Sequence, residues 1–275
     1  MIEFRCNSYN KKDRTPIVSD LEIMDYAEAV IGDYKKSLLK DPAAINPEHF
    51  LESYLGATLD YQDIYYEEDQ GAIAGATVFN DEKVLIFDRE NMCVRPIDVE
   101  ANTIIIDNST VEEGKEAFAL FTELHEGGHF CIHPCVYRRT PGQLSLFESH
   151  DRGEHIVKCK RSSLENRKGR LVTEEDFREH QANVFAATTA MPRPTFVPAA
   201  KEYIRKVGIG EKNGLIVIPD EFDWAYELGK YDVICPLTNL FGASRTATEI
   251  HMKRLGLIVT ETQYMDQYRQ VSVVF

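Results

Sequence analysis

Apolar residues recur at helical spacing over much of the chain. Leu21, Met24, Ala27 and Ile31 follow one another at intervals of three and four residues behind a serine–glutamate capping box. They predict an amphipathic helix over residues 19–39. Similar spacing, with caps or stop residues at the ends, predicts further helices over residues 46–56, 112–133, 173–191, 197–206, 221–229, 237–241 and 244–255.

The pattern changes between residues 58 and 107. Runs of β-branched and aromatic residues, separated by Gly, Asp and Asn, predict the strands Thr58–Tyr66, Ala72–Asn80, Lys83–Asp88 and Asn102–Asp107. We expect them to form a small, mostly antiparallel sheet. The turn at residues 80–82 predicts that the second and third strands pair as a hairpin. One more strand is expected at Gly214–Pro219.

These elements indicate an α+β fold. Residues 138–170 are basic and polar, which is typical of a long loop outside the core rather than of a core element. The last two predicted helices have the outline of a helix-turn-helix. We therefore expect a domain of residues 1–195, in which the sheet packs against helices, and a C-terminal helical, winged-helix-like region of residues 196–275.

Charge and composition narrow the class of protein. The 275 residues include 31 Lys and Arg against 45 Asp and Glu, a formal charge of -14, which disfavours binding of DNA through a broad basic surface. We expect a protein partner and no direct nucleic-acid binding. The chain lacks a signal-peptide pattern and any run of about 18 apolar residues, so we expect a cytoplasmic protein without membrane contact, whose six cysteines are reduced.

The helix over residues 112–133 carries the clearest chemistry. His125 and His129 stand one turn apart on one helix face, so both imidazoles can reach one Zn²⁺ ion. Glu126 is rotated away from the metal yet close enough to take a proton from its bound water. The pattern His-Glu-x-x-His is typical of a zinc metallopeptidase. Two adjacent helical glycines, Gly127 and Gly128, indicate close approach of another backbone or of substrate.

Catalytic zinc sites usually have three protein ligands, and the third must come from elsewhere. We interpret His133 as a helix-end histidine near unsatisfied carbonyls, because it lies a further turn along. Glu179 is a candidate, since Ala182 and Ala186 beside it are small and allow close helix packing. It could equally be one solvent-facing acid in a charged stretch, and its position alone leaves both readings open.

A second metal site is a further hypothesis. Several donors follow the first motif, but their spacing matches no standard zinc finger. The alternative is that the cysteines are small buried hydrophobes and the histidines are solvated. The donors concerned are Cys131, His133, Cys135, His150, His155 and Cys159.

Two segments resemble a known family. The sequence FTELHEGGHFCIH at residues 121–133 is similar to the core of the ImmA/IrrE-type metallopeptidases, and EHQANVFAATTAMP at residues 179–192 is similar to that family's second helix. The resemblance implies that Glu179 is the third zinc ligand, with His125 and His129, in a gluzincin-like site. Gly127, where the family commonly has a larger residue, and the long 138–170 segment depart from the pattern.

The resemblance also implies a function: a zinc endopeptidase that cleaves a helix-turn-helix repressor and so relieves repression. Glu126 is then the catalytic base. A rival is a regulatory protein that keeps zinc and sequesters its partner without cutting it. A second rival, a DNA reader built on residues 237–256, conflicts with the acidic charge of the chain.

Overall fold

The structure is a computed structural model that describes residues 1–67, 71–138, 156–161 and 171–272. The chain forms two compact units, the first of Met1–Tyr34 with Asn46–Thr189 and the second of Lys35–Ile45 with Ala190–Phe275. The division thus falls a few residues before the expected boundary at 195, and one short early segment belongs with the C-terminal unit. In the described part of the chain, no helix combines the length and the hydropathy needed to cross a membrane.

The first unit contains a four-stranded sheet. Its order is β1 (Thr58–Gln62), β5 (Thr103–Asp107), β2 (Ile73–Val78) and β6 (Ile156–Lys160). β1 runs parallel to β5, whereas β2 is antiparallel to both of its neighbours. The sheet is therefore small and mostly antiparallel, as expected. β6 was not predicted from the sequence, and it lies within residues 138–170, the segment that was interpreted as a long loop.

The expected hairpin between the second and third strands is wrong. β3 (Glu82–Asp88) pairs instead with β4 (Cys93–Val99), and the two form a separate antiparallel sheet. β4 was not predicted because Pro96 and the charged residues beside it are not typical of a strand. Its only strand partner in the described chain is β3, and such an edge strand tolerates a proline that cannot donate to a ladder.

Capping residues set the helix starts as predicted. The backbone N–H of Glu22 donates to Ser19 Oγ over 3.3 Å, and that of Asp176 donates to Thr173 Oγ1 over 3.1 Å. Asn46 accepts a hydrogen bond from the N–H of His49. The helical segments of the first unit are α1 (Asp20–Lys35), α2 (Pro47–His49), η2 (Phe50–Leu55), η4 (Asn108–Thr110), α3 (Glu116–Ile132), α4 (Pro134–Tyr137) and α6 (Glu174–Ala190). The short helix η1 (Lys36–Leu39) follows α1 directly in the chain and belongs to the second unit.

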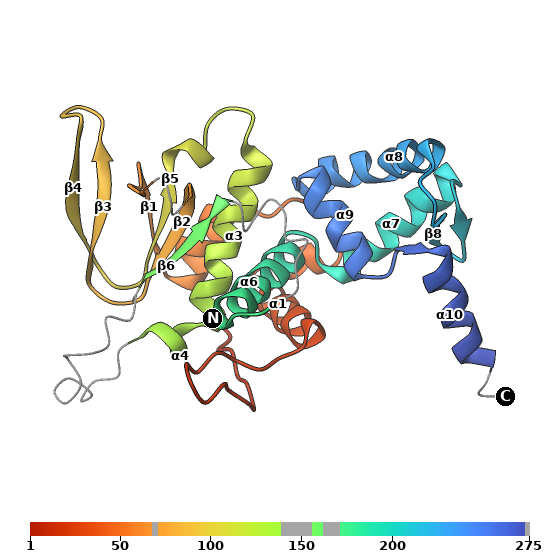
Figure 1. Cartoon of the computed structure of the whole chain (residues 1–275), viewed down its shortest axis with the longest axis horizontal. Coiled ribbons are helices and arrows are strands. Elements are labelled where there is room, and N and C mark those ends of the chain that lie inside the picture. The colour runs from red at the N-terminus through yellow and green to blue at the C-terminus, as the bar shows by residue number, and fades with distance from the viewer. Residues whose placement is uncertain (68–70, 139–155, 162–170, 273–275) are drawn as a thin grey trace. The chain divides into compact units, whose positions relative to one another are not determined.

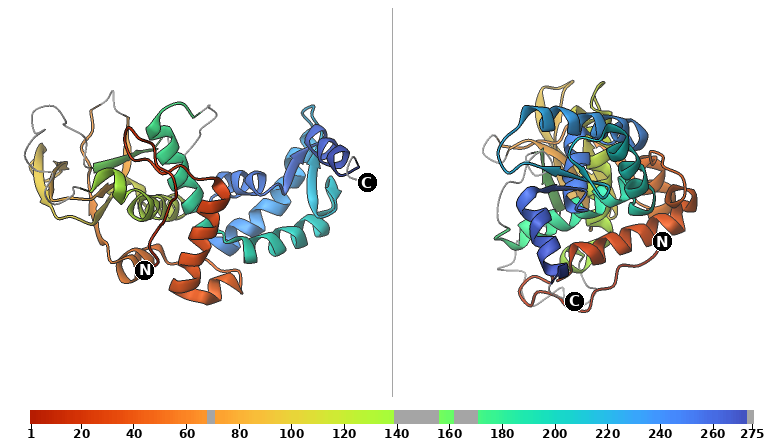
Figure 2. Two further views of the ribbon diagram at one scale, coloured as in Figure 1. Left: turned by 90° about the horizontal axis from the view of Figure 1, so that it is seen from below. Right: turned by 90° about the vertical axis from the view of Figure 1, so that its right-hand side faces the viewer.

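α3 is the central helix of the first unit. It packs on β2 and β5 of the sheet, and α6 crosses it at an angle (Figures 1 and 2). A Cβ atom at Gly128 would lie 3.1 Å from the Cα atom of Ala182, so the two helix backbones approach closely there. At Gly127 it would lie 2.8 Å from a methyl group of Leu51. The glycine pair therefore allows tight packing on two sides of α3.

The described part of the second unit contains four α-helices, the short 3-10 helix η1 and a three-stranded sheet. α8 is one continuous helix through Pro236, whereas the sequence predicted separate helices over residues 221–229 and 237–241. Lys230 sits inside the predicted gap, where its Nζ contacts Glu227 at 2.7 Å and Glu249 at 2.9 Å. These ion pairs let a buried lysine continue the helix. The elements are α7 (Arg193–Val207), β7 (Glu211–Lys212), β8 (Leu215–Ile218), α8 (Trp224–Phe241), α9 (Arg245–Arg254), β9 (Ile258–Thr260) and α10 (Glu261–Ser272).

Candidate metal centre

Three side chains from two helices converge beside α3. His125 and His129 lie on successive turns of α3 with their Nε2 atoms 3.0 Å apart. Glu179 reaches them from α6, with Oε1 3.2 Å from Nε2 of His129 and Oε2 3.6 Å from Nε2 of His125. Both histidines are fully buried and Glu179 is 3% exposed. The structure thus brings together the three residues that the sequence suggested as ligands.

A chain of hydrogen bonds determines the tautomer of His129. Gln181 Nε2 donates to the carbonyl of Pro16 over 2.7 Å, so its Oε1 accepts from His133 Nε2 over 2.9 Å. Burial lowers the pKa of His133 well below its usual value, so this ring is neutral and its Nδ1 is an acceptor. Nδ1 of His129, 3.0 Å away, therefore donates to it. Nε2 of His129 is left unprotonated, as a metal ligand must be.

The corresponding contact orients His125. Its Nδ1 donates to Asn183 Oδ1 over 3.0 Å, which leaves Nε2 with a lone pair. Burial lowers the pKa of both His125 and His129 to about 3, so both rings are neutral near pH 7. Asn183 and Gln181 are two residues apart on α6, so one helix orients both histidines as well as supplying Glu179.

The spacing of these atoms fits a bound cation. Two unprotonated nitrogens at 3.0 Å, beside a carboxylate at 3.2 and 3.6 Å, repel one another unless a positive charge lies among them. A tetrahedral ion with bonds of ~2.0–2.1 Å separates its ligand atoms by roughly 3.3–3.4 Å. The three distances bracket that value, so this donor set suits a zinc-sized ion.

Glu126, next to His125 on α3, reaches β2 of the sheet. Its Oε2 accepts a hydrogen bond from Thr77 Oγ1 of β2 over 2.6 Å, while Oε1 is buried without a hydrogen-bond partner among the described residues. A Cβ atom at Gly75 would lie 3.0 Å from Oε1, so a glycine on β2 makes room for the carboxylate. Burial raises the pKa of Glu126 well above its usual value, and the charge of Glu179 adds to this. A glutamate in this state readily holds a proton.

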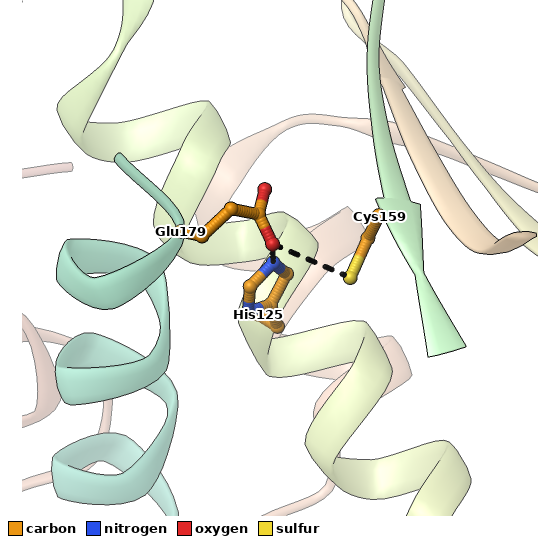
Figure 3. A group of neighbouring side chains, drawn as sticks. All are labelled: His125, Cys159 and Glu179. Carbon is orange, nitrogen blue, oxygen red and sulfur yellow. Dashed lines mark hydrogen bonds and ion pairs between the residues drawn. The ribbon is translucent and has the colours of Figure 1, made fainter. Parts of the chain in front are cut away.

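Cys159 also belongs to this site, although the sequence suggested it only as a donor for a separate second metal site. Its thiol comes from β6 and lies 4.0 Å from Glu179 Oε2 (Figure 3). His125, Cys159 and Glu179 each offer a ligand atom within 4.8 Å of the others, so this cluster could hold a metal ion. The alternation of buried Val157 and Cys159 with exposed Lys158 and Lys160 was the signal that could have revealed a strand.

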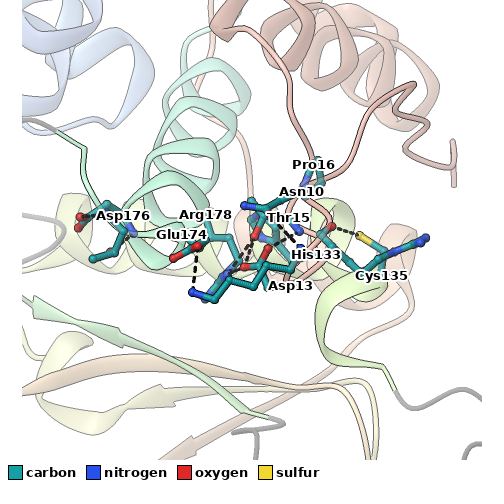
Figure 4. Close-up of polar contacts among 12 residues, drawn as sticks. Asn10, Asp13, Thr15, Pro16, His133, Cys135, Glu174, Asp176 and Arg178 are labelled. Carbon is teal, nitrogen blue, oxygen red and sulfur yellow. Dashed lines mark hydrogen bonds and ion pairs between the residues drawn. The ribbon is translucent and has the colours of Figure 1, made fainter.

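The N-terminal segment contacts α6, the helix that carries Glu179. Arg178, next to Glu179 on α6, donates from Nη1 to Asp13 Oδ2 over 2.5 Å and to Thr15 Oγ1 over 2.9 Å (Figure 4). The next residue of this segment, Pro16, accepts the hydrogen bond of Gln181. Residues 13–16 therefore fix the position of α6 and the end of the hydrogen-bond chain that reaches His129.

The donors proposed for a second metal site do not gather in the described structure. Cys131 is buried on α3, whereas Cys135 is exposed and contacts the carbonyl of Arg14 over 3.6 Å. Cys159 belongs to the site of Glu179 instead. His150 and His155 lie outside the described residues. All six cysteines are in described segments, and none of them forms a disulfide.

Comparison with known proteins adds no further identification. No protein-family model matches the chain, and no curated protein sequence matches it. The resemblance to the ImmA/IrrE-type metallopeptidases therefore stays a prediction from the sequence, and residues 121–133 and 179–192 are the two segments that mainly carry it. The geometry of the side chains in those two segments carries the functional argument.

Proposed function

We propose that this protein is a zinc-dependent endopeptidase that hydrolyses a peptide bond in a regulatory protein. The observation that carries the proposal is the convergence of two unprotonated histidine nitrogens and one carboxylate, all buried, beside a glutamate with a vacant acceptor. His125, His129 and Glu179 would hold the metal. A bound Zn²⁺ would supply a Lewis acid that polarises the peptide carbonyl and acidifies a water molecule.

Glu126 acts as the general base and then as the general acid. Its Oε2 is held by Thr77, and its Oε1 has no competing partner, so Oε1 can accept the proton of the attacking water. The raised pKa favours keeping that proton until the amine leaves. Glu126 then returns the proton from Oε1 to the leaving nitrogen.

The choice of substrate follows from the resemblance. ImmA/IrrE-type metallopeptidases cleave helix-turn-helix repressors, so we propose such a repressor as the substrate and relief of repression as the outcome. The net charge of -14 supports a protein partner rather than direct binding to DNA.

The test is a Glu126→Gln variant co-produced with a candidate repressor. Glutamine keeps the size of the side chain and the hydrogen bond to Thr77 but cannot accept the proton, so zinc should remain bound while cleavage stops. Metal analysis gives the zinc content, and mass spectrometry of the repressor shows whether it is cut. Substrates trapped by the inactive variant would be identified in the same experiment. Complete cleavage by Glu126→Gln would exclude the proposed base.

A second candidate function is a non-proteolytic anti-repressor that contains zinc and sequesters its partner. One observation favours it: the proposed ligands and Glu126 are buried, and a further potential donor, Cys159, lies within 4.8 Å of the ligand atoms of His125 and Glu179. Metal sites closed by four protein ligands are typically structural. One experiment distinguishes the two functions: co-production of the wild-type chain with the repressor. A peptidase would yield two repressor fragments, whereas an anti-repressor would yield an intact complex of the two proteins.

A further inference from the structure

The position of Cys159 is determined by its strand pairing. β6 ends the sheet order, and its described partner is β2, where Cys159 lies opposite Gly75. Residues directly opposite each other in an antiparallel pair project to the same face of the sheet. A side chain at Gly75 would meet Glu126, so Cys159 projects toward the same side of the sheet as the catalytic carboxylate.

The thiol also lies among the proposed ligands. Cys159 is 0% exposed, its Sγ is 4.0 Å from Glu179 Oε2, and its ligand atom is within 4.8 Å of those of His125 and Glu179. Thiolate sulfur is among the preferred ligands of zinc. This cluster shares His125 and Glu179 with the cluster of His125, His129 and Glu179, which makes Cys159 a candidate fourth donor beside the three proposed ligands.

Four protein donors change what the site can do. A zinc ion with four protein ligands is coordinatively complete, whereas a catalytic zinc keeps one position for water. His125, Glu126, His129 and Cys159 are all 0% exposed, so the described conformation also gives a peptide no access to them. The strand β6 brings the sulfur to this buried site.

We propose that Cys159 is a fourth, displaceable ligand of the metal and that β6 thereby holds the peptidase in an inactive state. When the strand withdraws, the sulfur–metal bond breaks, the thiolate takes a proton from solvent, and a water molecule occupies the free coordination position. This inference rests on the proposed zinc peptidase and goes beyond it, because it assigns a regulatory role to a residue outside the His-Glu-x-x-His motif.

Cobalt(II) substitution tests the ligand directly. Cobalt bound to a thiolate absorbs in the near ultraviolet by charge transfer from sulfur, and this band is absent with nitrogen and oxygen ligands alone. We expect the band in the wild-type protein, its loss in Cys159→Ser, and its retention in Cys131→Ser, which removes an equally buried thiol from α3. Serine keeps the size of the side chain, and Cys159→Ala serves if the serine variant does not fold.

Activity tests the regulatory part. Cys159→Ser should cleave a denatured, fluorescently labelled protein at least roughly tenfold faster than the wild type, and it should release zinc to a chelator faster. The double variant Cys159→Ser/Glu126→Gln should be inactive. An unchanged rate in Cys159→Ser would overturn the inactive-state proposal.

The outcomes distinguish this inference from the function on which it rests. Stoichiometric cobalt binding without a charge-transfer band, or with the same band in Cys159→Ser, would overturn the fourth ligand and leave the peptidase proposal standing. Failure of the wild-type protein to bind zinc or cobalt at all would overturn both. Retention of the metal by Cys159→Ser, with loss of the band, supports the sulfur ligand.

Discussion

The Nδ1 atoms of His129 and His133 lie 3.0 Å apart on successive turns of the α3 region, and the second ring is held by Gln181 of α6. Through this contact, a residue outside the His-Glu-x-x-His motif determines the protonation state of a proposed ligand inside it. Because His133 accepts a hydrogen bond from His129, we propose that it is a positioning residue for the metal centre.

Replacement of His133 should therefore weaken zinc binding without removing a ligand. In His133→Ala, Nδ1 of His129 loses its acceptor and the ring is free to adopt the other tautomer, so zinc affinity should fall by roughly 10–100-fold. Competition with a chelator measures this. His180→Ala is the matched control, since His180 lies on α6 but hydrogen-bonds to Asp20 rather than to a ligand. Equal affinities for His133→Ala and the wild type would contradict the positioning role.

Packing at Gly128 should control the position of Glu179. In Gly128→Ala, the added methyl group meets the backbone of Ala182 at 3.1 Å, and backbone cannot move aside as a side chain can. We expect a loss of about 1–3 kcal/mol in the free energy of unfolding, together with weaker zinc binding.

Gly127→Ala is the control for that experiment. Its methyl group meets the flexible end of Leu51, and alanine gains up to about 1 kcal/mol in helix propensity, so the net change should be small. Urea unfolding and chelator competition on both variants give the comparison. If the two variants lose stability and zinc affinity equally, close approach of α6 is not the reason for the glycine at 128.

Glu123 should make stability depend on pH. Burial raises its pKa to about 7, and the nearby Glu48 contributes. A carboxyl whose pKa is raised in the folded state contributes stability that is complete below its unfolded pKa of about 4.5 and is lost as the pH rises through about 7. The loss amounts to roughly 3 kcal/mol. Glu123→Gln should abolish it and keep the hydrogen bond from Tyr61.

Urea unfolding at pH 5 and pH 8 checks this expectation. The free energy of unfolding of the variant, relative to that of the wild type, should rise by about 2.5 kcal/mol from pH 5 to pH 8. Glu175→Gln, which removes an exposed carboxyl from α6, should show no such rise. Parallel pH profiles for Glu123→Gln and the wild type would show that Glu123 ionises normally in the folded protein.

Local signals in the sequence predicted the helices of the first unit and the two motifs of the site. The caps at Ser19, Asn46 and Thr173 act through hydrogen bonds to residues three positions away, so a short window of sequence contains the whole signal. The spacing of His125 and His129 is of the same kind, since both depend on the geometry of one helix turn.

Long-range features were not predictable in this way. The pairing of β3 with β4 was missed because Pro96 in β4 is untypical of a strand. The parallel pairing of β1 with β5 joins segments that are far apart in the chain. Cys159 reaches the centre only because β6 pairs with β2. The role of His133 likewise required the position of Gln181, which tertiary structure alone supplies.

The zinc content of purified Glu179→Gln, compared with that of the wild type, tests the central claim most directly. Glutamine preserves the volume and the helix but removes the charge that faces His125 and His129 at 3.6 and 3.2 Å. We predict a single zinc ion in each wild-type chain and strongly reduced zinc in the variant, measured by elemental analysis after dialysis against a chelator. Full zinc occupancy in Glu179→Gln would contradict the proposed metal centre.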